Sequence, residues 1–316
     1  MSMKPLVLYH ANCWDGFCAA WIARKALGEI EAVPVQYGQD PPDVVGRPVF
    51  VLDFSYPRML MQALIRYAAS VVVLDHHKTA KDELDGLDGY CGATIRFDLD
   101  KSGGRLAWDF FFGNKYATKY TPESCEQLRP WLVDYTEDRD LWRWKLPKSR
   151  EVNAALRSYP LDYALWDRWH EDGFNVMLLA PEGEAILRRE QQIIDEHVKH
   201  AREIEMDGYK ILSVNATVLF SDIAGELAAS PCGRCEGDGK AHGSDRPFEY
   251  SGPGSYPGPC PVCSGSGKRP FGACWFERQD GKRQWSLRSR EGGVDVSEVA
   301  KRRGGGGHKN AAGFEE

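Results

Sequence analysis

The first third of the chain alternates short apolar runs with segments whose apolar residues recur at helical spacing. The runs at 6–9, 49–52 and 71–74 are continuously apolar, which is typical of strands buried on both faces of a parallel sheet. Helical spacing predicts helices over 15–27 and 58–69. Because strands alternate with helices, the pattern predicts an α/β fold whose first sheet is mainly parallel.

The middle of the chain, from 125 to 205, has a mostly helical pattern. We expect a helical connector at 182–206 between a first domain at 1–181 and a smaller α/β domain at 207–316, although a surface helix of the first domain would show a similar pattern. In the second domain the pattern predicts strands at 210–214, 216–220, 273–278 and 284–288 and helices at 221–229 and 294–300.

One segment of the second domain, 231–270, lacks the residues for an apolar core. Nine of its 40 residues are glycine and seven are proline, and almost none is a large aliphatic residue. Such a segment is disordered unless something other than apolar burial holds it. Because strand patterns resume after it, we expect it to be an insertion into the second domain.

Two repeats of the form Cys-x-x-Cys-x-Gly-x-Gly lie in this insertion, at Cys232 and Cys235 and at Cys260 and Cys263. Four thiolates in two such pairs are typical of a tetrahedral structural zinc site, and the glycines allow tight turns. The repeats resemble the zinc-binding motif of DnaJ-type chaperones. A thioredoxin-like redox pair is the alternative. One structural Zn²⁺ would order a zinc-ribbon-like segment that has no core of its own.

Composition and charge restrict the partners of the chain. Ten Trp, 13 Tyr and 13 Phe supply core material, so the whole chain is not disordered. Forty basic and 46 acidic side chains give a net charge of −6, which excludes a bulk positive field for long duplex nucleic acid. No apolar run approaches the roughly 20 residues needed to cross a bilayer, and the first run is too short for a signal peptide. We therefore expect a cytoplasmic protein with no membrane partner.

Side chains that bind metals follow each of the three apolar runs, at His10, at Asp53 and at Asp75-His76-His77. Ligands bind at the carboxyl ends of the strands in open parallel sheets, so we expect these groups around one crevice. A single Asp after a strand is more often a turn or N-cap residue, but three converging strands favour a metal site. Imidazole with carboxylate suits Mn²⁺, Mg²⁺, Fe²⁺ or Zn²⁺, and the oxygen-rich mixture favours Mn²⁺.

Five segments resemble, in chain order, the motifs of the DHH/DHHA1 phosphoesterase superfamily, which includes oligoribonucleases (nano-RNases) and RecJ-like exonucleases. The resemblance implies a DHH domain, a DHHA1 domain and Mn²⁺-dependent hydrolysis of phosphodiester bonds in a crevice between them. The segments are 10–17, 51–55, 75–77, 134–142 and 304–314, the last of which reads GGGGHKNAAGF.

The resemblance also implies a role for each matching side chain. By motif position, His10 and Asp15 ligate metal, Asp53 bridges two ions and His76 binds the second ion. Whether one ion or two are bound, and whether Mg²⁺ replaces Mn²⁺, stays open. Two divalent ions would activate water and clamp the attacking and leaving oxygens of a phosphodiester, so no protein nucleophile is needed.

Three acidic positions of the fourth motif compete for the last ligand. Asp138 is the preferred choice, followed by Asp140, with Asp134 as the remaining candidate. Asp75 is either a ligand or the group that orients a histidine, which is a common task of carboxylates near metals. His77 would face the phosphate, and we place Asp75, His76 and His77 in the catalytic set.

The glycine-rich motif near the C-terminus is expected to bind phosphate. Glycine lets backbone amides approach a phosphate closely and form an anion-binding nest. A flexible glycine tail is the alternative, but the ordered pattern on either side favours binding. His308 and the preceding Ser-Leu-Arg-Ser strand would add donors. The expected substrate-binding set is His77, Arg288, Ser289, Gly305, Gly306, Gly307 and His308.

The leading function is hydrolysis of short single-stranded RNA or DNA oligonucleotides to mononucleotides, as an exonuclease would perform. A second enzymatic interpretation is a phosphatase or phosphodiesterase for small nucleotides such as 3′-phosphoadenosine-5′-phosphate or a cyclic dinucleotide. A third is a nucleic-acid-binding adaptor whose catalytic centre has decayed. The oligomeric state stays open, a homodimer included. The tryptophans that either stack bases or pack the core are Trp142, Trp144, Trp166 and Trp169.

Overall fold

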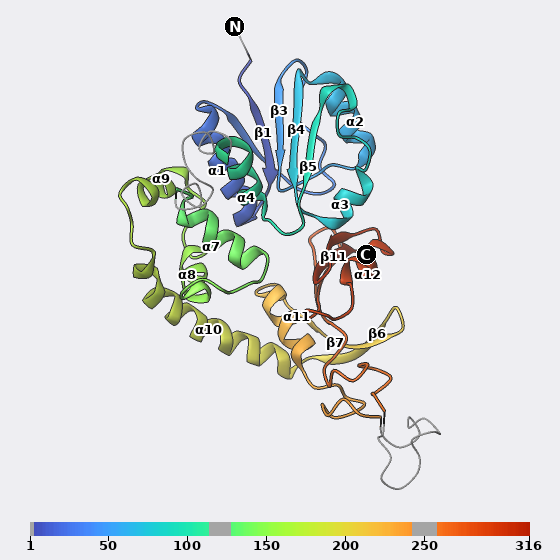
Figure 1. Cartoon of the computed structure of the whole chain (residues 1–316). Coiled ribbons are helices and arrows are strands. Elements are labelled where there is room, and N and C mark those ends of the chain that lie inside the picture. Colours follow the sequence, from blue (N-terminus) through green and yellow to red (C-terminus); the bar gives the residue numbers. More distant parts are fainter. Residues whose placement is uncertain (1–2, 114–127, 242–257) are drawn as a thin grey trace. The chain divides into compact units, whose positions relative to one another are not determined.

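The computed structural model describes residues 3–113, 128–241 and 258–316. The chain divides into two compact units, Met1–Arg188 and Arg189–Glu316. The boundary falls within helix α10 (Ala180–Lys199). Each unit contains one β-sheet with helices packed on it (Figure 1), so the predicted α/β class is confirmed. The domain limits drawn from the sequence, at 181 and 207, stay predictions.

The first unit is built on a five-stranded sheet in which every pairing is parallel. The three apolar runs form its central strands, as predicted. The two edge strands were not predicted from the sequence. One of them contains Pro34, which lacks an N–H donor and is therefore suited to an edge position. In spatial order the strands are β2 (Glu31–Val35), β1 (Leu6–His10), β3 (Pro48–Leu52), β4 (Ser70–Asp75) and β5 (Thr94–Phe97).

Both faces of this sheet are covered, because consecutive residues of each central strand enter different cores. Val7 packs into a core with α1 (Trp14–Leu27) and α4 (Gly103–Trp108), whereas Leu6 packs into a core with α2 (Arg58–Tyr67). The remaining helical segments of the unit are α3 (Lys78–Glu83), α7 (Trp131–Asp140), α8 (Ser149–Leu156), α9 (Tyr163–Glu171) and short turns at Tyr90–Gly92, Asp109–Gly113 and Val176–Leu179.

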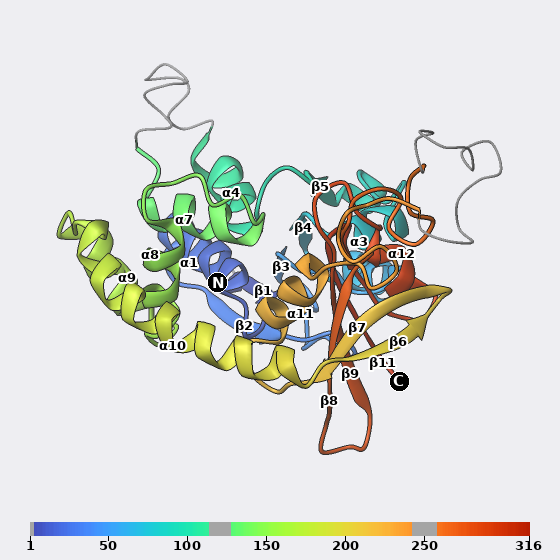
Figure 2. The same ribbon diagram turned by 90° about the horizontal axis from the view of Figure 1, so that it is seen from below.

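The second unit contains a mixed six-stranded sheet, seen from below in Figure 2. Helix α12 (Val296–Lys301) and helix α11 (Phe220–Ala229) belong to different apolar cores of this unit. In spatial order the strands are β10 (Gly306–His308), β11 (Ala311–Glu315), β9 (Arg283–Arg288), β8 (Gly272–Glu277), β7 (Tyr209–Asn215) and β6 (Arg202–Met206).

Two predictions for the start of this unit were wrong. The connector helix expected over 182–206 ends at Lys199, and its last part is strand β6, which pairs antiparallel with β7. Asp207 and Gly208 have φ values of 51° and 81°, so this Asp-Gly pair forms the two-residue turn that hairpins favour. No strand forms over 216–220, because Leu219 adopts a left-handed conformation (φ 49°) directly before α11.

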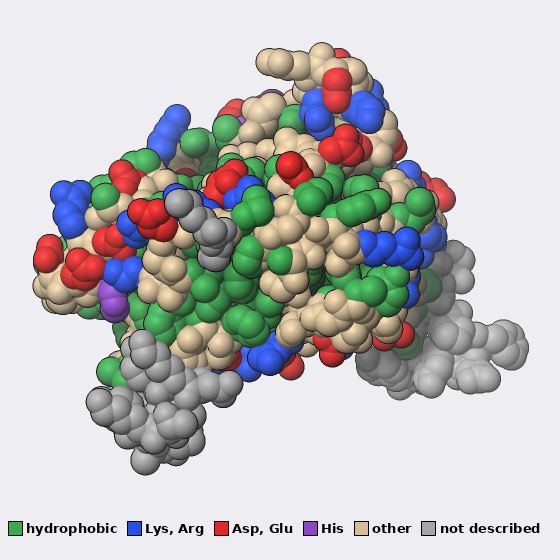
Figure 3. Space-filling view, turned by 90° about the horizontal axis from the view of Figure 1, so that it is seen from above, with side chains coloured by type: hydrophobic (Ala, Val, Ile, Leu, Met, Phe, Trp, Pro, Cys, Tyr) green, Lys and Arg blue, Asp and Glu red, His purple; other side chains and the backbone are tan. Residues whose placement is uncertain are grey.

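The surface in Figure 3 carries acidic and basic side chains interspersed around hydrophobic ones. This mixture agrees with the absence of a net positive charge on the chain. Within the residues that the structure describes, no helix combines the length and the apolar character required to cross a bilayer.

Candidate functional site

The carboxyl ends of three neighbouring strands bring His10, Asp53 and His76 together. His10 ends β1, Asp53 follows β3 and His76 follows β4. The His76 Nε2 atom lies 3.1 Å from Asp53 Oδ1, and His10 Nδ1 lies 3.6 Å from Asp53 Oδ2. Asp53 has a φ of 55°, a conformation that Asp tolerates better than most residues. Its carboxylate therefore lies between two imidazoles that come from different strands.

Asp15 adds a second buried carboxylate from the first turn of α1. Its Oδ2 atom is 3.7 Å from His76 Nε2, and its two oxygens accept hydrogen bonds from the amides of Gly103 and Gly104. These amides open helix α4, where N–H groups have no partner within the helix. Potential ligand atoms of Asp15, Asp53 and His76 all lie within 4.8 Å of one another.

Two glycines are required for this close packing, and sequence reasoning missed both. A Cβ atom on Gly103 would lie 2.5 Å from the Cβ of Asp53, and one on Gly16 would lie 2.5 Å from the carbonyl oxygen of His10. The signal for Gly103 was available, because Ser102-Gly103-Gly104 precedes a helical pattern and Ser102 caps it.

The structure brings Asp140, rather than Asp138 or Asp134, to this cluster. Asp140 Oδ2 lies 3.5 Å from His76 Nε2. Asp138 instead accepts hydrogen bonds from the backbone amides of Lys145 and Leu146, at 2.9 and 3.3 Å. The carboxylate of Asp134 pairs with the Arg129 side chain. The sequence placed Asp138 first, but the structure places Asp140 beside His76, because the Asp138 carboxylate fastens the turn after α7.

Asp75 orients the second histidine of the pair. Its Oδ1 atom is 2.7 Å from His77 Nδ1, while its Oδ2 accepts a hydrogen bond from the Ser55 hydroxyl at 2.6 Å. Although burial opposes ionisation, the neighbouring His77 lowers the pKa of Asp75 to about 2. Of the two roles considered for Asp75, the geometry favours orientation of the histidine.

The electrostatics of the cluster suit a cation. Burial raises the pKa of Asp15 well above its usual value, and the nearby carboxylates of Asp53 and Asp140 act in the same direction. Burial also opposes ionisation of Asp53, but His10 and His76 hold its pKa well below the usual range. Burial would lower the pKa of His76, yet the three carboxylates around it raise this pKa to about 10. The cluster thus concentrates negative charge that a positive group must balance.

Several polar atoms of the cluster have no hydrogen-bond partner among the described residues. They are His10 Nδ1, Asp53 Oδ2 and Asp140 Oδ2, and all three are buried. Buried polar atoms are nearly always satisfied, so atoms left open at one place indicate a missing ligand. Mixed imidazole and carboxylate donors fit Mn²⁺ or Mg²⁺ better than a soft metal.

The four tryptophans considered for base stacking divide into two groups. Trp166 and Trp169 are buried in the core of the first unit, so packing explains them. Trp142 and Trp144 follow α7, contact each other with ring centroids 5.1 Å apart, and Trp142 is 41% exposed. This pair is the one that keeps an accessible aromatic surface.

In the second unit the glycine-rich segment forms a strand and a helix cap rather than an open nest. The amides of Gly304 and Gly305 donate to carbonyl oxygens of Lys301 and Ala300 and so close helix α12. Gly306 to His308 form β10, and a Cβ on Gly307 would lie 2.5 Å from the Ala311 carbonyl oxygen. The glycines are therefore required for close strand contact.

The polar residues of the expected substrate set do lie near one another in this sheet. Ala311 pairs with His308 on one side and with Arg288 on the other, so the three residues stand in one row. Arg288 donates to the Ser221 hydroxyl at 2.8 Å, and Ser289 Oγ accepts from the Asn310 side chain at 2.8 Å. Asn310 and Ser221 were not singled out in the sequence.

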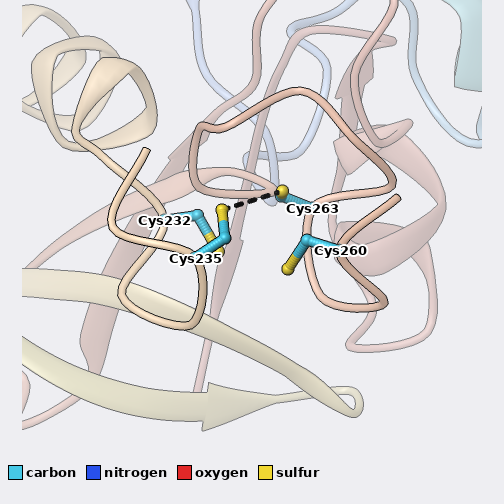
Figure 4. A group of neighbouring side chains, drawn as sticks. All are labelled: Cys232, Cys235, Cys260 and Cys263. Carbon is cyan, nitrogen blue, oxygen red and sulfur yellow. Dashed lines mark hydrogen bonds between the residues drawn. The ribbon is translucent and has the colours of Figure 1, made fainter. Parts of the chain in front are cut away.

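The four cysteines of the insertion form one buried cluster (Figure 4), with all sulfur atoms within 4.8 Å of one another. Cys235 Sγ and Cys263 Sγ are 3.6 Å apart, which excludes a disulfide and matches the edge of a tetrahedron with metal–sulfur bonds of about 2.3 Å. The amides of Gly239 and Gly267 each donate to a sulfur at 3.3 Å. The cluster can bind zinc.

Comparison with known proteins gives one relative by sequence and several by structure. No model of a known protein family matches the chain. An uncharacterized protein of Acanthamoeba polyphaga mimivirus is 25% identical over 331 residues, which cover 98% of this chain and 66% of the relative. The chain therefore spans about two thirds of the length of that protein.

The solved structures similar to this chain include a RecJ from Thermus thermophilus in complex with Mn²⁺ (TM-score 0.47, 14% identity, 98% of this chain and 49% of that chain). A DHH domain from a member of a family of ribosomal proteins has a TM-score of 0.47 and 12% identity over 98% of this chain and 82% of its own. A pGpG-specific phosphodiesterase from Vibrio cholerae has a TM-score of 0.36 and 12% identity over 100% and 93% of the two chains.

Proposed function

We propose that this chain is a metal-dependent phosphoesterase of the DHH/DHHA1 type that hydrolyses short single-stranded oligonucleotides to mononucleotides. The observation that carries the proposal is the cluster of Asp15, Asp53 and Asp140 around His76. Within the described part of the chain, buried oxygen atoms of Asp53 and Asp140 in this cluster have no hydrogen-bond partner. Metal-dependent hydrolysis of a phosphodiester needs a site that binds divalent cations, and the imidazole and carboxylate groups of this cluster can ligate them.

His10, Asp15, Asp53, His76 and Asp140 would hold the divalent ion or ions, with Mn²⁺ preferred. A bound ion would supply Lewis-acid activation of the phosphodiester and of the attacking water. Asp75 fixes the ring of His77 through the 2.7 Å contact to Nδ1, and this oriented imidazole would face the substrate phosphate.

In the second unit Arg288, Ser289 and His308 would bind substrate phosphate through charge-assisted hydrogen bonds. The net charge of −6 favours a short substrate, because a long strand needs an extended basic groove. One Zn²⁺ held by the four cysteines would order the insertion.

The test is Mn²⁺-dependent turnover of a dinucleotide and of a 24-mer by the full chain, beside the Asp53→Ala variant. We expect the wild type to release mononucleotides, faster from the dinucleotide, and the variant to be inactive. Turnover of 3′-phosphoadenosine-5′-phosphate or a cyclic dinucleotide alone would favour a small-nucleotide enzyme. If wild type and variant are equally inert on every substrate, the adaptor interpretation replaces the enzymatic one.

A further inference from the structure

The second unit contains a cavity that the proposed hydrolytic function does not use. It has a volume of about 620 Å³ and lies beside the end of α10 and strands β6 to β9, which Figure 2 shows next to one another. It includes none of the residues assigned above to metal or phosphate binding. We call it the Trp275 cavity.

Two indole rings and a set of basic side chains line the Trp275 cavity. Trp275 and Trp285 have ring centroids 6.2 Å apart, and the Arg283 guanidinium lies 4.7 Å from the centroid of the Trp275 ring. Arg202, His197 and His200 lie on the side of the cavity formed by α10 and β6. A cation against an aromatic face matches a ligand that combines a flat ring with an anion.

The charges of this cavity are not balanced by its own lining, which contains no Asp or Glu. His200 pairs with Glu196 at 3.5 Å, whereas Arg202 and Arg283 are exposed and form no ion pair within the described ranges of the chain. A larger cavity of about 840 Å³ in the first unit differs in this respect, because its Arg24 pairs with Asp167 at 2.8 Å and its Lys25 with Glu171 at 2.7 Å. Because two of its arginines have no acidic partner among the described residues, the Trp275 cavity is better suited to an anion than the larger cavity.

A buried hydroxyl supports a polar ligand at the same place. Ser213 lines the Trp275 cavity, is 5% exposed, and its Oγ atom has no hydrogen-bond partner in the part of the chain that the structure covers. A buried hydroxyl without a partner costs free energy that a ligand can recover. The neighbouring Asn215 amide is already engaged with the Trp275 carbonyl oxygen at 3.1 Å.

We propose that the Trp275 cavity binds a nucleoside phosphate, with the base against Trp275 and the phosphate on Arg202 and Arg283. Bases of every kind stack on indole rings, and guanidinium groups pair with phosphate through paired hydrogen bonds. The site goes beyond the proposed hydrolysis, because binding here needs no metal and no turnover.

The test uses the full chain carrying Asp53→Asn, so that hydrolysis does not consume the probe, and labels it with 8-azido-AMP under light. We expect label in β8 or β9, and we expect AMP to compete at least 10-fold better than adenosine or inorganic phosphate. In a parallel experiment, a single-stranded hexanucleotide competes with the label in place of AMP. Comparing the two competitors shows whether the cavity prefers a free nucleotide or the end of a strand, and competition by either supports the site.

Two variants in the same background locate the label. Arg202→Gln combined with Arg283→Gln, and separately Trp275→Leu, should each reduce labelling of β8 and β9 at least 10-fold. Arg278→Gln is the matched control, because this exposed arginine pairs with Glu315 outside the cavity and its loss should leave the label in place. Label elsewhere only, label unaffected by both variants, or phosphate competing as well as AMP would overturn the proposal.

Discussion

At the scale of single residues, the candidate metal centre contains residues whose local conformation or surroundings cost free energy. Asp140 stands at the C-terminal end of α7, where the helix dipole disfavours a carboxylate. Asp53 adopts a left-handed backbone conformation, and Gly103 is packed so tightly against it that no side chain fits. Such local costs persist where function requires the geometry.

Asp140 and Asp138 form a matched pair for a test at this scale. Asp140→Asn should lower Mn²⁺-dependent turnover by about 100-fold or more, because it removes a charged group beside His76. Asp138→Asn should retain metal-dependent turnover but lower the free energy of unfolding by about 1–3 kcal/mol, since it weakens two bonds to backbone amides. Turnover kinetics and urea unfolding of both variants measure these effects. Loss of turnover in Asp138→Asn, with turnover retained in Asp140→Asn, would favour Asp138 as the ligand.

At the scale of elements, the four-cysteine insertion contains two similar loops joined by backbone hydrogen bonds. The amide of Cys232 donates to the Gly267 carbonyl oxygen, and the amide of Cys260 donates to that of Gly239, both at 2.8 Å. The insertion also contacts the segment that follows β9, because Arg290 donates to the Ser266 hydroxyl at 3.0 Å. The insertion thus connects the four-cysteine cluster with the residue that follows Ser289.

Glycine-to-alanine substitutions test how strictly these elements are packed. A Cβ on Gly239 would lie 2.3 Å from the Gly265 carbonyl oxygen, and Gly239 has a φ of 74°. We expect Gly239→Ala to lower the zinc content of the purified protein. Gly225→Ala in α11 meets nothing within 4 Å and should raise the free energy of unfolding by about 0.5–1 kcal/mol. Metal analysis and thermal unfolding measure the two effects, and unchanged zinc in Gly239→Ala would contradict the packing argument.

At the scale of the whole molecule, the two candidate metal sites draw on separate units. The proposed ligands His10, Asp15, Asp53, His76 and Asp140 belong to the first unit, and the four cysteines belong to the second. Their chemistry also differs, because thiolates prefer zinc whereas carboxylate with imidazole accepts Mn²⁺. The two sites should therefore load and unload independently.

A zinc-selective chelator should release about one zinc per chain and leave Mn²⁺ binding to the first unit intact. Amide hydrogens of the cysteine loops and of the loop at Arg290 should then exchange faster. The reason is that a disordered insertion no longer holds Ser266 in place for its hydrogen bond with Arg290. Metal analysis with peptide-resolved hydrogen exchange measures both effects. An ordered insertion in zinc-free protein would refute the structural role of the metal.

The sequence by itself determined the local features of this protein. Continuous apolar runs give central strands wherever both faces are covered, and the residues that end those strands meet at one edge because parallel strands share a direction. Paired Cys-x-x-Cys spacing likewise specifies four sulfurs in one cluster, because each pair occupies one tight turn.

Tertiary structure alone decided the rest. Asp138 and Asp140 lie two positions apart on one helix, and only the docking of α7 determines which of them lies near His76. Gly103 and Gly104 reach Asp15 across more than 80 positions, a contact that no local pattern encodes. The first glycines of the run donate hydrogen bonds to carbonyl oxygens of α12, and the following residues pair with β11. The run therefore forms a helix cap and a strand. Local chemistry fixes which groups are present, whereas long-range packing fixes which of them touch.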